Sequence, residues 1–385
     1  MEVRKLYYED SHLWEFTATV TGCVPAEKGW LITLDATAFY PEGGGQACDL
    51  GALGEAKVLD VQEKDGQVQH LCDQPLQLGQ RVTGHVDRDR RFDLMQQHTG
   101  EHIVSGIINQ RFGYHNVGFH MGADLVTIDF DGMLHSDDLA VIEKEANEAI
   151  WRNIEVRCWY PTQEELPNVG YRSKKELPWP VRVVEVPGYD KCACCGVHVQ
   201  RTGQIGLIKL FSCVKFHQGV RIEMACGGRA LNFLSRVYEQ NRQVSQAFSA
   251  KVLETGEAAR RINEQLAAEK FRAASLEKQV FDAIAQGYTD CGNVVRFEDG
   301  LQGASLRELS DRIARKCGGT AAVLSGSDAD GYNLCLVNKT EDVKALGNAL
   351  SETFGGRGGG KPGFFQGSIR GNKAGITAFF AQYWK

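Results

Sequence analysis

Two pairs of metal-binding residue types, far apart in the chain, place the strongest constraint on how this sequence can fold. His98 and His102 are four residues apart, and so are Cys194 and His198. On a helix, the first spacing puts both imidazoles on one face, with Cβ atoms about 5–6 Å apart. The second pair encloses Gly196, which lets the segment bend so that a thiolate and an imidazole converge on one ion. The fold must therefore bring the two segments together.

The donor atoms indicate which ion such a site would hold. Three imidazole nitrogens and one thiolate suit tetrahedral zinc, whereas magnesium and calcium prefer oxygen ligands. We therefore predict one zinc ion per chain, bound by His98, His102, Cys194 and His198. Cys195 is adjacent and could supply the thiolate instead. The alternative is that Cys192, Cys194 and Cys195 are buried structural thiols.

Composition favours a soluble protein with two or three hydrophobic cores. The 385 residues are 43% hydrophobic and 24% charged. The start of the chain lacks the apolar core of a signal peptide, and no apolar run is long enough to span a membrane, so we expect a cytoplasmic location. The 12 cysteines are scattered apart from a cluster at 192–195, which favours reduced thiols and a metal over disulfides.

The sequence pattern predicts an α+β protein with four parts. Residues 1–88 show short alternating strands typical of a small β-barrel. Residues 89–230 predict a zinc-binding α+β domain, with helices over 91–111 and 137–152. Its expected strands cover 124–130 and 154–159, and strands at 181–186, 206–211 and 219–224 complete a sheet.

The last two parts are helical and α/β. Residues 231–287 predict two helices broken near 254–256, and the apolar stripes fit either an antiparallel arm or a dimerising coiled coil. Residues 288–385 predict a small α/β domain with strands at 321–324 and 334–337 and a helix at 342–353. A flexible glycine loop at 355–360 is expected to follow.

Charge separates the end of the chain from the rest. A formal net charge of −6 argues against nonspecific nucleic-acid binding as the main activity. From Thr353 onward, however, there is no acidic residue. The cations there are Arg357, Lys361, Arg370, Lys373 and Lys385.

Several motifs, in their order along the chain, resemble the editing module of alanyl-tRNA synthetase. They are Phe-Tyr-Pro-Glu-Gly-Gly-Gly-Gln at 39–46, the His98/His102 pair, Cys-x-Gly-x-His-Val from Cys194, Thr-Gly-Gln-Ile-Gly at 202–206 and Arg-Ile-Glu at 221–223. Gly-Gly-Arg-Gly-Gly-Gly-Lys-Pro at 355–362, followed by Gln366-Gly367, resembles the signature of the DHHA1 domain. Freestanding editing factors of the AlaX type, long form, combine the two modules. This chain departs from the usual Cys-Gly-Gly-Thr-His at Cys195 and Val197, and it contains no Asp-His-His.

The resemblance implies hydrolysis of mischarged tRNA, with serine or glycine removed from tRNA(Ala). Because no class II catalytic core precedes the motifs, the chain is not expected to charge tRNA. Gln46, Glu101 and His120 are the candidate catalytic residues, with Asn116 as a further polar candidate. Arg357, Lys361, Arg370 and Lys373 are the candidate tRNA-binding residues. A homodimer through the helical arm or the C-terminal domain is possible.

Three other functions fit part of the sequence. A non-catalytic tRNA-binding module with a structural zinc would use the same four ligands as a closed site. A zinc protease is suggested by His-x-x-Glu-His at 98–102, in which Glu101 would be the general base, but it leaves Cys194 and His198 unexplained. A Ser-tRNA(Thr) deacylase would share the histidine and cysteine pattern, and the alanyl-type C-terminal domain argues against it.

Overall fold

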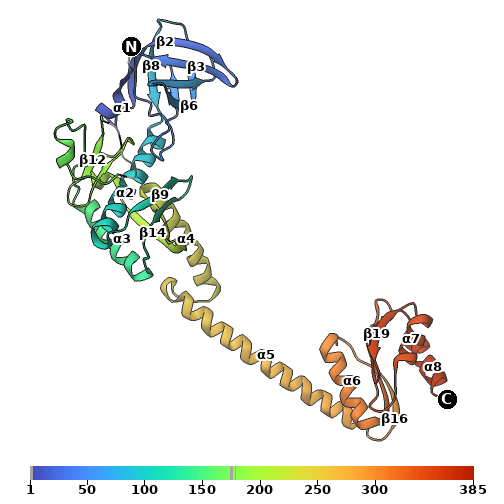
Figure 1. Cartoon of the computed structure of the whole chain (residues 1–385). Helices are drawn as coiled ribbons and strands as arrows, with labels where there is room; N and C mark the ends of the chain where they lie inside the picture. Colours follow the sequence, from blue (N-terminus) through green and yellow to red (C-terminus); the bar gives the residue numbers. More distant parts are fainter. Residues whose placement is uncertain (1–2, 174–176, 178) are drawn as a thin grey trace. The chain divides into compact units, whose positions relative to one another are not determined.

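The structure is a computed structural model that describes residues 3–173, 177 and 179–385 (Figure 1). Its contacts divide the chain into two compact units, residues 1–243 and 244–385. Helices and several separate sheets alternate along the chain, so the predicted α+β class is confirmed.

Six strands near the N-terminus close into a barrel in the order β2-β3-β7-β6-β5-β8. Phe16, Ala18 and Val20 of β2 are buried at alternate positions, because successive side chains of a strand point to opposite faces. The preceding β1 (Arg4–Lys5) and α1 (Leu6–Glu9) lead into it, and β1 pairs in parallel with β4 (Ala36–Thr37). The barrel strands are β2 (Glu15–Ala26), β3 (Gly29–Leu34), β5 (Gly51–Leu53), β6 (Ala56–Lys64), β7 (Gln67–Cys72) and β8 (Arg81–Val86).

Helix α2 (Arg88–Phe112) begins where the barrel ends and forms the centre of the next module. The Asp87 side chain accepts a hydrogen bond from the Arg90 backbone and caps the helix, and Gly113 ends it in the left-handed conformation. We expected one apolar flank, but nearly every residue from Leu94 to Ile108 is buried. Gly100 lets the helix approach the end of β15, because a Cβ there would lie 2.2 Å from the Cys226 Sγ.

Two sheets flank α2, not the single sheet that the pattern predicted. One has the order β14-β15-β10-β9 and the other β11-β12-β13. Strands β9 and β13 were not predicted, because each is short and β13 lies in the cysteine cluster. The strands are β9 (Asn116–Met121), β10 (Val126–Phe130), β11 (Arg157–Trp159), β12 (Val183–Val186), β13 (Asp190–Ala193), β14 (Ile208–Phe216) and β15 (Gly219–Cys226). Helix α3 (Ser136–Trp151) and the short 3-10 helices η1 (Leu166–Asn168) and η2 (Thr202–Ile205) complete the module.

Two long helices follow, α4 (Gly227–Ala247) and α5 (Thr255–Gln286). The predicted break was a few residues late, because the helix stops after Ala247 and Gly256 already lies inside α5. The 3-10 helix η3 (Val252–Glu254) lies between them.

The C-terminal domain is a five-stranded sheet with helices on both faces. Its strand order is β16-β17-β18-β20-β19. Alternate residues of β17 enter different cores: Ala321 and Val323 pack with α6, whereas Ala322 and Leu324 pack with α7 and α8. The elements are β16 (Gly292–Phe297), α6 (Gly303–Cys317), β17 (Gly318–Ser327), β18 (Gly331–Val337), α7 (Lys344–Thr353), β19 (Arg357–Lys361), β20 (Phe364–Ile369) and α8 (Lys373–Tyr383).

The prediction of a flexible loop at 355–360 was wrong, because most of this segment is the edge strand β19, paired antiparallel with β20. Glycine is needed for close packing instead: a Cβ at Gly358 would lie 2.6 Å from the Phe365 ring, and one at Gly360 would lie 2.0 Å from the Phe364 carbonyl oxygen. In the described residues, no helix has the length and apolar character to cross a bilayer.

Candidate metal centre and active site

The four predicted ligands meet in the centre of the α2 module. His98 and His102 come from α2, Cys194 follows β13, and His198 lies in the next loop. One donor atom from each residue lies within 4.8 Å of all the others. The Cys194 Sγ is 3.5 Å from the Nε2 of both His98 and His198. Cys195 is exposed and outside this group, so the geometry selects Cys194 as the thiolate donor.

Each histidine is oriented through its other ring nitrogen, Nδ1. The Gln46 Oε1 is 2.8 Å from the Nδ1 of His98, and the Asp190 carboxylate is 2.9 Å from the Nδ1 of His102. The Thr99 hydroxyl donates to the Met95 carbonyl, so its lone pairs accept from the Nδ1 of His198 at 3.2 Å. All three partners are acceptors, so each imidazole keeps a proton on Nδ1 and is oriented with Nε2 as the atom available to an ion.

Asp190 is held in turn by an arginine. The Arg172 guanidinium donates two hydrogen bonds, 2.7 and 2.9 Å long, to the Asp190 carboxylate. This charge-assisted fork fixes the carboxylate that orients His102. Burial alone raises the pKa of Asp190, but the hydrogen bonds and charges of His102 and Arg172 lower this pKa below its usual value. The Asp190 carboxylate therefore stays ionised.

The charges of the ligands suit a cation. Burial alone raises the pKa of Cys194, but His98 and His102 outweigh it and hold this pKa well below its usual value. Burial lowers the pKa of His198 to about 3, so this imidazole is neutral. A thiolate and a neutral imidazole are the ligand forms that zinc requires. The residues present therefore fit a zinc ion.

The loop that carries Cys194 and His198 is fixed through its carbonyl oxygens. The Arg182 side chain donates to the carbonyls of Cys194 and Gly196, at 3.0 and 2.8 Å. The Tyr8 hydroxyl donates to the Cys195 carbonyl at 2.8 Å, and the Arg182 guanidinium lies over the Tyr8 ring. These contacts join α1 and β12 to the ligand loop, and neither Tyr8 nor Arg182 was predicted from the sequence.

A pocket of about 380 Å³ opens beside the ligands. It presents apolar groups from Phe119, Leu177 and Ala193 together with polar groups. Its lining also includes Gly44, Gly45, His98, Glu101, His102, Asn116, Arg172, Ser173, Cys192, Cys194 and Cys195. The volume is in the range of small-molecule sites, and three of the four candidate ligands lie within the lining.

Glu101 is a buried part of this pocket, although its helical position also fitted a solvated surface residue. It is 5% exposed, and its Oε1 accepts hydrogen bonds from Ser105 at 2.6 Å and from Asn116. Its Oε2 lies 4.0 Å from the Nε2 of His102. One oxygen of the carboxylate is thereby fixed and the other lies near the ligand set.

The other two candidate catalytic residues lie differently. Gln46 is 1% exposed and contacts the site through His98 and the Val197 backbone. His120 is exposed and absent from the lining in the described residues. Strand alternation explains this, because the neighbouring Phe119 lines the pocket and stacks on His98.

Comparison with known proteins agrees with this geometry. Family models match at residues 6–90 (tRNA synthetases class II (A)), 181–223 (threonyl and alanyl tRNA synthetase second additional domain) and 291–384 (DHHA1 domain). The alanyl-tRNA editing protein Aarsd1 of Rattus norvegicus is 28% identical over 407 residues, covering 98% of this chain and 97% of its own length. Over nearly its whole length, this chain is therefore similar to an alanyl-tRNA editing protein.

This chain is also similar to part of a larger enzyme. The alanine-tRNA ligase of Halorubrum lacusprofundi is 33% identical over 388 residues. The match covers 95% of this chain but only 42% of the ligase, so the chain spans less than half the length of that relative. It spans 93% of the Aarsd1 editing protein of Mus musculus, at 28% identity.

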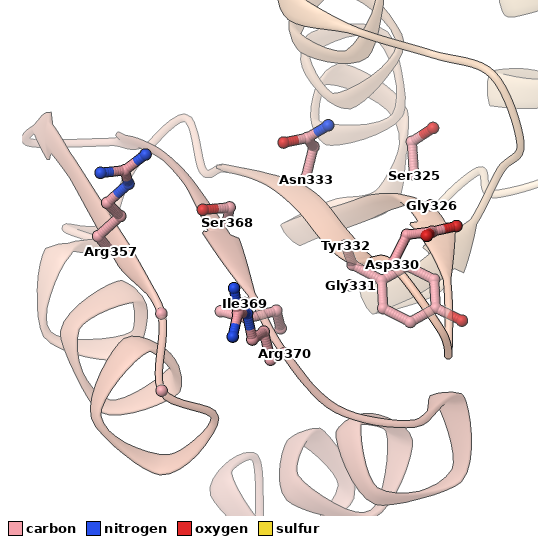
Figure 2. Close-up of a pocket in the computed structure, with 12 residues that line it drawn as sticks. Ser325, Gly326, Asp330, Gly331, Tyr332, Asn333, Arg357, Ser368, Ile369 and Arg370 are labelled. Carbon is pink, nitrogen blue, oxygen red and sulfur yellow. The ribbon is translucent and has the colours of Figure 1, made fainter.

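In the DHHA1 match, the four predicted tRNA-binding cations are all exposed but do not form one cluster. Figure 2 shows Arg357 and Arg370 beside an open pocket of about 590 Å³, whose lining also includes Asn333 and Ser368. Lys361, at the other end of β19, lines a separate pocket. The Lys373 ammonium lies 5.2 Å from the centre of the Phe297 ring.

Proposed function

We propose that this protein is a trans-editing hydrolase that removes serine or glycine from mischarged tRNA(Ala). The observation that carries the proposal is a pocket of about 380 Å³ lined by Glu101 and by three of the four candidate ligands. The names of two relatives that match over nearly their full length, and the match to the threonyl and alanyl tRNA synthetase second additional domain, support the same activity.

We also propose zinc as the metal, held by His98, His102, Cys194 and His198, one ion per chain. Three nitrogens and one thiolate, all within 4.8 Å of one another, support this identity, because zinc prefers tetrahedral coordination by such ligands. When bound, zinc supplies a Lewis acid for the ester carbonyl or for a water molecule. The Nδ1 contacts to Gln46, Thr99 and Asp190 hold the imidazole rings in place for the ion.

In this proposal Glu101 is the general base. An aminoacyl ester is already activated, so the enzyme has to orient a water molecule and accept its proton. Ser105 and Asn116 hold the Glu101 Oε1, which leaves Oε2 beside the ligands to accept that proton. Gln46 acts by orienting His98, and the exposed His120 is given no part in the chemistry.

The remaining parts of the proposal concern the whole chain. Arg357, Lys361, Arg370 and Lys373 are proposed to contact the tRNA backbone, because exposed cations attract phosphate. We keep the four-part division at 1–88, 89–230, 231–287 and 288–385, with the barrel as the first part. We also propose that the protein is cytoplasmic and that it forms a homodimer through residues 231–287 or the C-terminal domain.

Release of serine from Ser-tRNA(Ala) tests the proposed activity. The purified protein should release serine from Ser-tRNA(Ala) and leave Ala-tRNA(Ala) largely intact, and Ser-tRNA(Thr) serves as the comparison substrate. Equal hydrolysis of Ser-tRNA(Ala) and Ala-tRNA(Ala), or hydrolysis of neither, contradicts the proposal. Faster hydrolysis of Ser-tRNA(Thr) would assign the enzyme to the threonyl substrate.

A further inference from the structure

The amide of Asn116 has an acceptor that the protein does not use. Asn116 is 6% exposed and lines the pocket beside Glu101 and the metal ligands. Its Oδ1 is buried and has no hydrogen-bond partner in the described residues. A buried amide oxygen without a partner costs about 1–3 kcal/mol, so such an atom requires an explanation.

The orientation of this amide is fixed by its other end. The Asn116 Nδ2 donates to the Glu101 Oε1 and, at 3.1 Å, to the Ser105 hydroxyl oxygen. The Ser105 hydroxyl donates its own proton to Glu101, so it can only accept from Asn116. Exchanging the two ends of the amide would place Oδ1 against a carboxylate and a hydroxyl whose proton is already donated. Oδ1 is therefore the unused end.

Asn147 shows what a purely structural asparagine looks like in the same module. It is 7% exposed, and its Nδ2 donates to the carbonyls of Glu143 and Ile208, both at 2.8 Å. Its Oδ1 accepts from the Ile208 backbone at 3.0 Å. Asn147 is satisfied at both ends, whereas Asn116 is satisfied only at Nδ2.

The electrostatics around Asn116 select a cationic donor. Glu101, a carboxylate in the same hydrogen-bonded network, lines the pocket. Arg172 also lines the pocket, but its guanidinium is paired with Asp190. The thiolate of Cys194 belongs to the metal ligands. The one donor that every aminoacyl ester offers in such a place is its α-ammonium group.

We propose that the Asn116 Oδ1, with Glu101, receives the α-ammonium group of the aminoacyl ester and makes Asn116 a specificity residue for substrates with a free α-amine. This inference rests on the proposed function, because it assigns part of the same pocket. It goes beyond that function by naming the substrate group that the pocket recognises. Esters without an α-amine and N-acylated esters are then poor substrates.

Binding of hydrolysis-resistant analogues tests the proposal without requiring catalysis. The probes are 3′-amide-linked seryl-adenosine, the glycyl analogue, and a 3-hydroxypropanoyl analogue that is serine without its α-amine. Wild-type protein should bind the seryl and glycyl analogues at least about 10-fold more tightly than the third, the value of one hydrogen bond to a charged group. Asn116→Ala should remove most of this preference, with unchanged zinc content.

Hydrolysis of minihelices carrying the corresponding esters gives a second readout. Asn116→Ala also removes a hydrogen bond to Glu101 and should slow hydrolysis of every ester, so the informative quantity is a ratio: kcat/KM for the seryl and glycyl esters should fall about 10-fold more than kcat/KM for the 3-hydroxypropanoyl ester. Asn116→Ser, which is too short to reach the same position, should behave alike. The control Asn147→Ala should lower the unfolding midpoint and leave the ratio of seryl to 3-hydroxypropanoyl ester hydrolysis unchanged.

Each of the other outcomes would contradict one part of the proposal. An equal loss on all three esters would make Asn116 structural. A loss on the seryl and 3-hydroxypropanoyl esters, with the glycyl ester unaffected, would mean that Oδ1 binds the side-chain hydroxyl instead of the ammonium group. If wild-type protein binds the amine-bearing analogues preferentially but hydrolyses no ester, the proposed function fails and the amine recognition stands.

Discussion

The metal centre and the C-terminal cations differ in burial and in how firmly their side chains are held. At the metal centre, His98, His102 and His198 are at most 3% exposed, and each has a second protein group on its Nδ1. The four C-terminal cations are exposed and spread over β19, the end of β20 and α8. Buried, oriented groups fix chemistry at one point, whereas exposed cations supply affinity for phosphate that depends on salt. Substitutions in the two regions should therefore have different consequences.

Removal of one metal ligand should give the largest effect. His102→Ala is expected to lose zinc and to lower deacylation about 1,000-fold or more, the size of effect seen when a main electrostatic element of an active site is lost. Binding of uncharged tRNA should persist, since it depends on the other region. Elemental analysis, a deacylation assay and a tRNA-binding assay measure the three properties, and circular dichroism checks that the variant is folded.

The exposed Cys195 provides the control for that experiment. Cys195→Ala should keep its zinc, whereas Cys194→Ala should lose it. Wild-type zinc content in Cys194→Ala would contradict the ligand set. Global unfolding of His102→Ala together with metal loss would favour a structural zinc over a catalytic one.

Glu101→Gln should give the next largest effect. Glutamine keeps an oxygen that can accept from Ser105 and Asn116, but it cannot take a proton, so kcat should fall about 100-fold while zinc content stays constant. Single-turnover deacylation separates this step from binding. Wild-type kcat in this variant would remove Glu101 from the chemistry.

Asp190→Asn should act on metal affinity. The amide still reaches the Nδ1 of His102 but no longer holds the imidazole as a charged acceptor, so the affinity for zinc should fall about 10-fold to 100-fold. Competition with a chelator measures this change. Equal zinc affinity in the variant and the wild type would show that the orientation of His102 does not depend on the carboxylate charge.

Substitution of the two arginines beside the C-terminal pocket should give the smallest effect. Arg357→Gln with Arg370→Gln should raise KM for full-length mischarged tRNA roughly 3-fold to 10-fold and flatten the salt dependence by about one unit per lost phosphate contact. Hydrolysis of a short aminoacyl-minihelix should not change. Arg260→Gln, an exposed position on α5, is the matched control.

Deletion of the C-terminal domain tests that region as a whole. Removal of 288–385 should raise the KM for mischarged tRNA further and preserve hydrolysis of the minihelix. If the shortened protein bound tRNA as well as the full chain and changed only from dimer to monomer, the C-terminal domain would be an assembly device.

Local pattern predicted most of the elements. The pattern predicted short strands within residues 1–88, where the barrel strands lie, and it located α2 and α3 within a few residues. The prediction at 355–360 was wrong because glycine is common both in flexible turns and in strands that pack tightly against a neighbour. Only the position of Phe365 distinguishes the two.

The sequence by itself determined the candidate metal donors except for the choice between Cys194 and Cys195, because spacing and residue chemistry are local properties: His98 and His102 share a helix face, and the cysteine and His198 share one short loop. The tertiary structure decided everything that depends on a neighbour distant in the chain. It places Cys194, and not Cys195, in the ligand group, and it pairs Asp190 with His102. It also buries the Glu101 carboxylate, although the helical position of Glu101 was compatible with exposure to solvent. The physical reason is that burial and hydrogen-bond partners are set by the packing of α2 between two sheets, which no local pattern specifies.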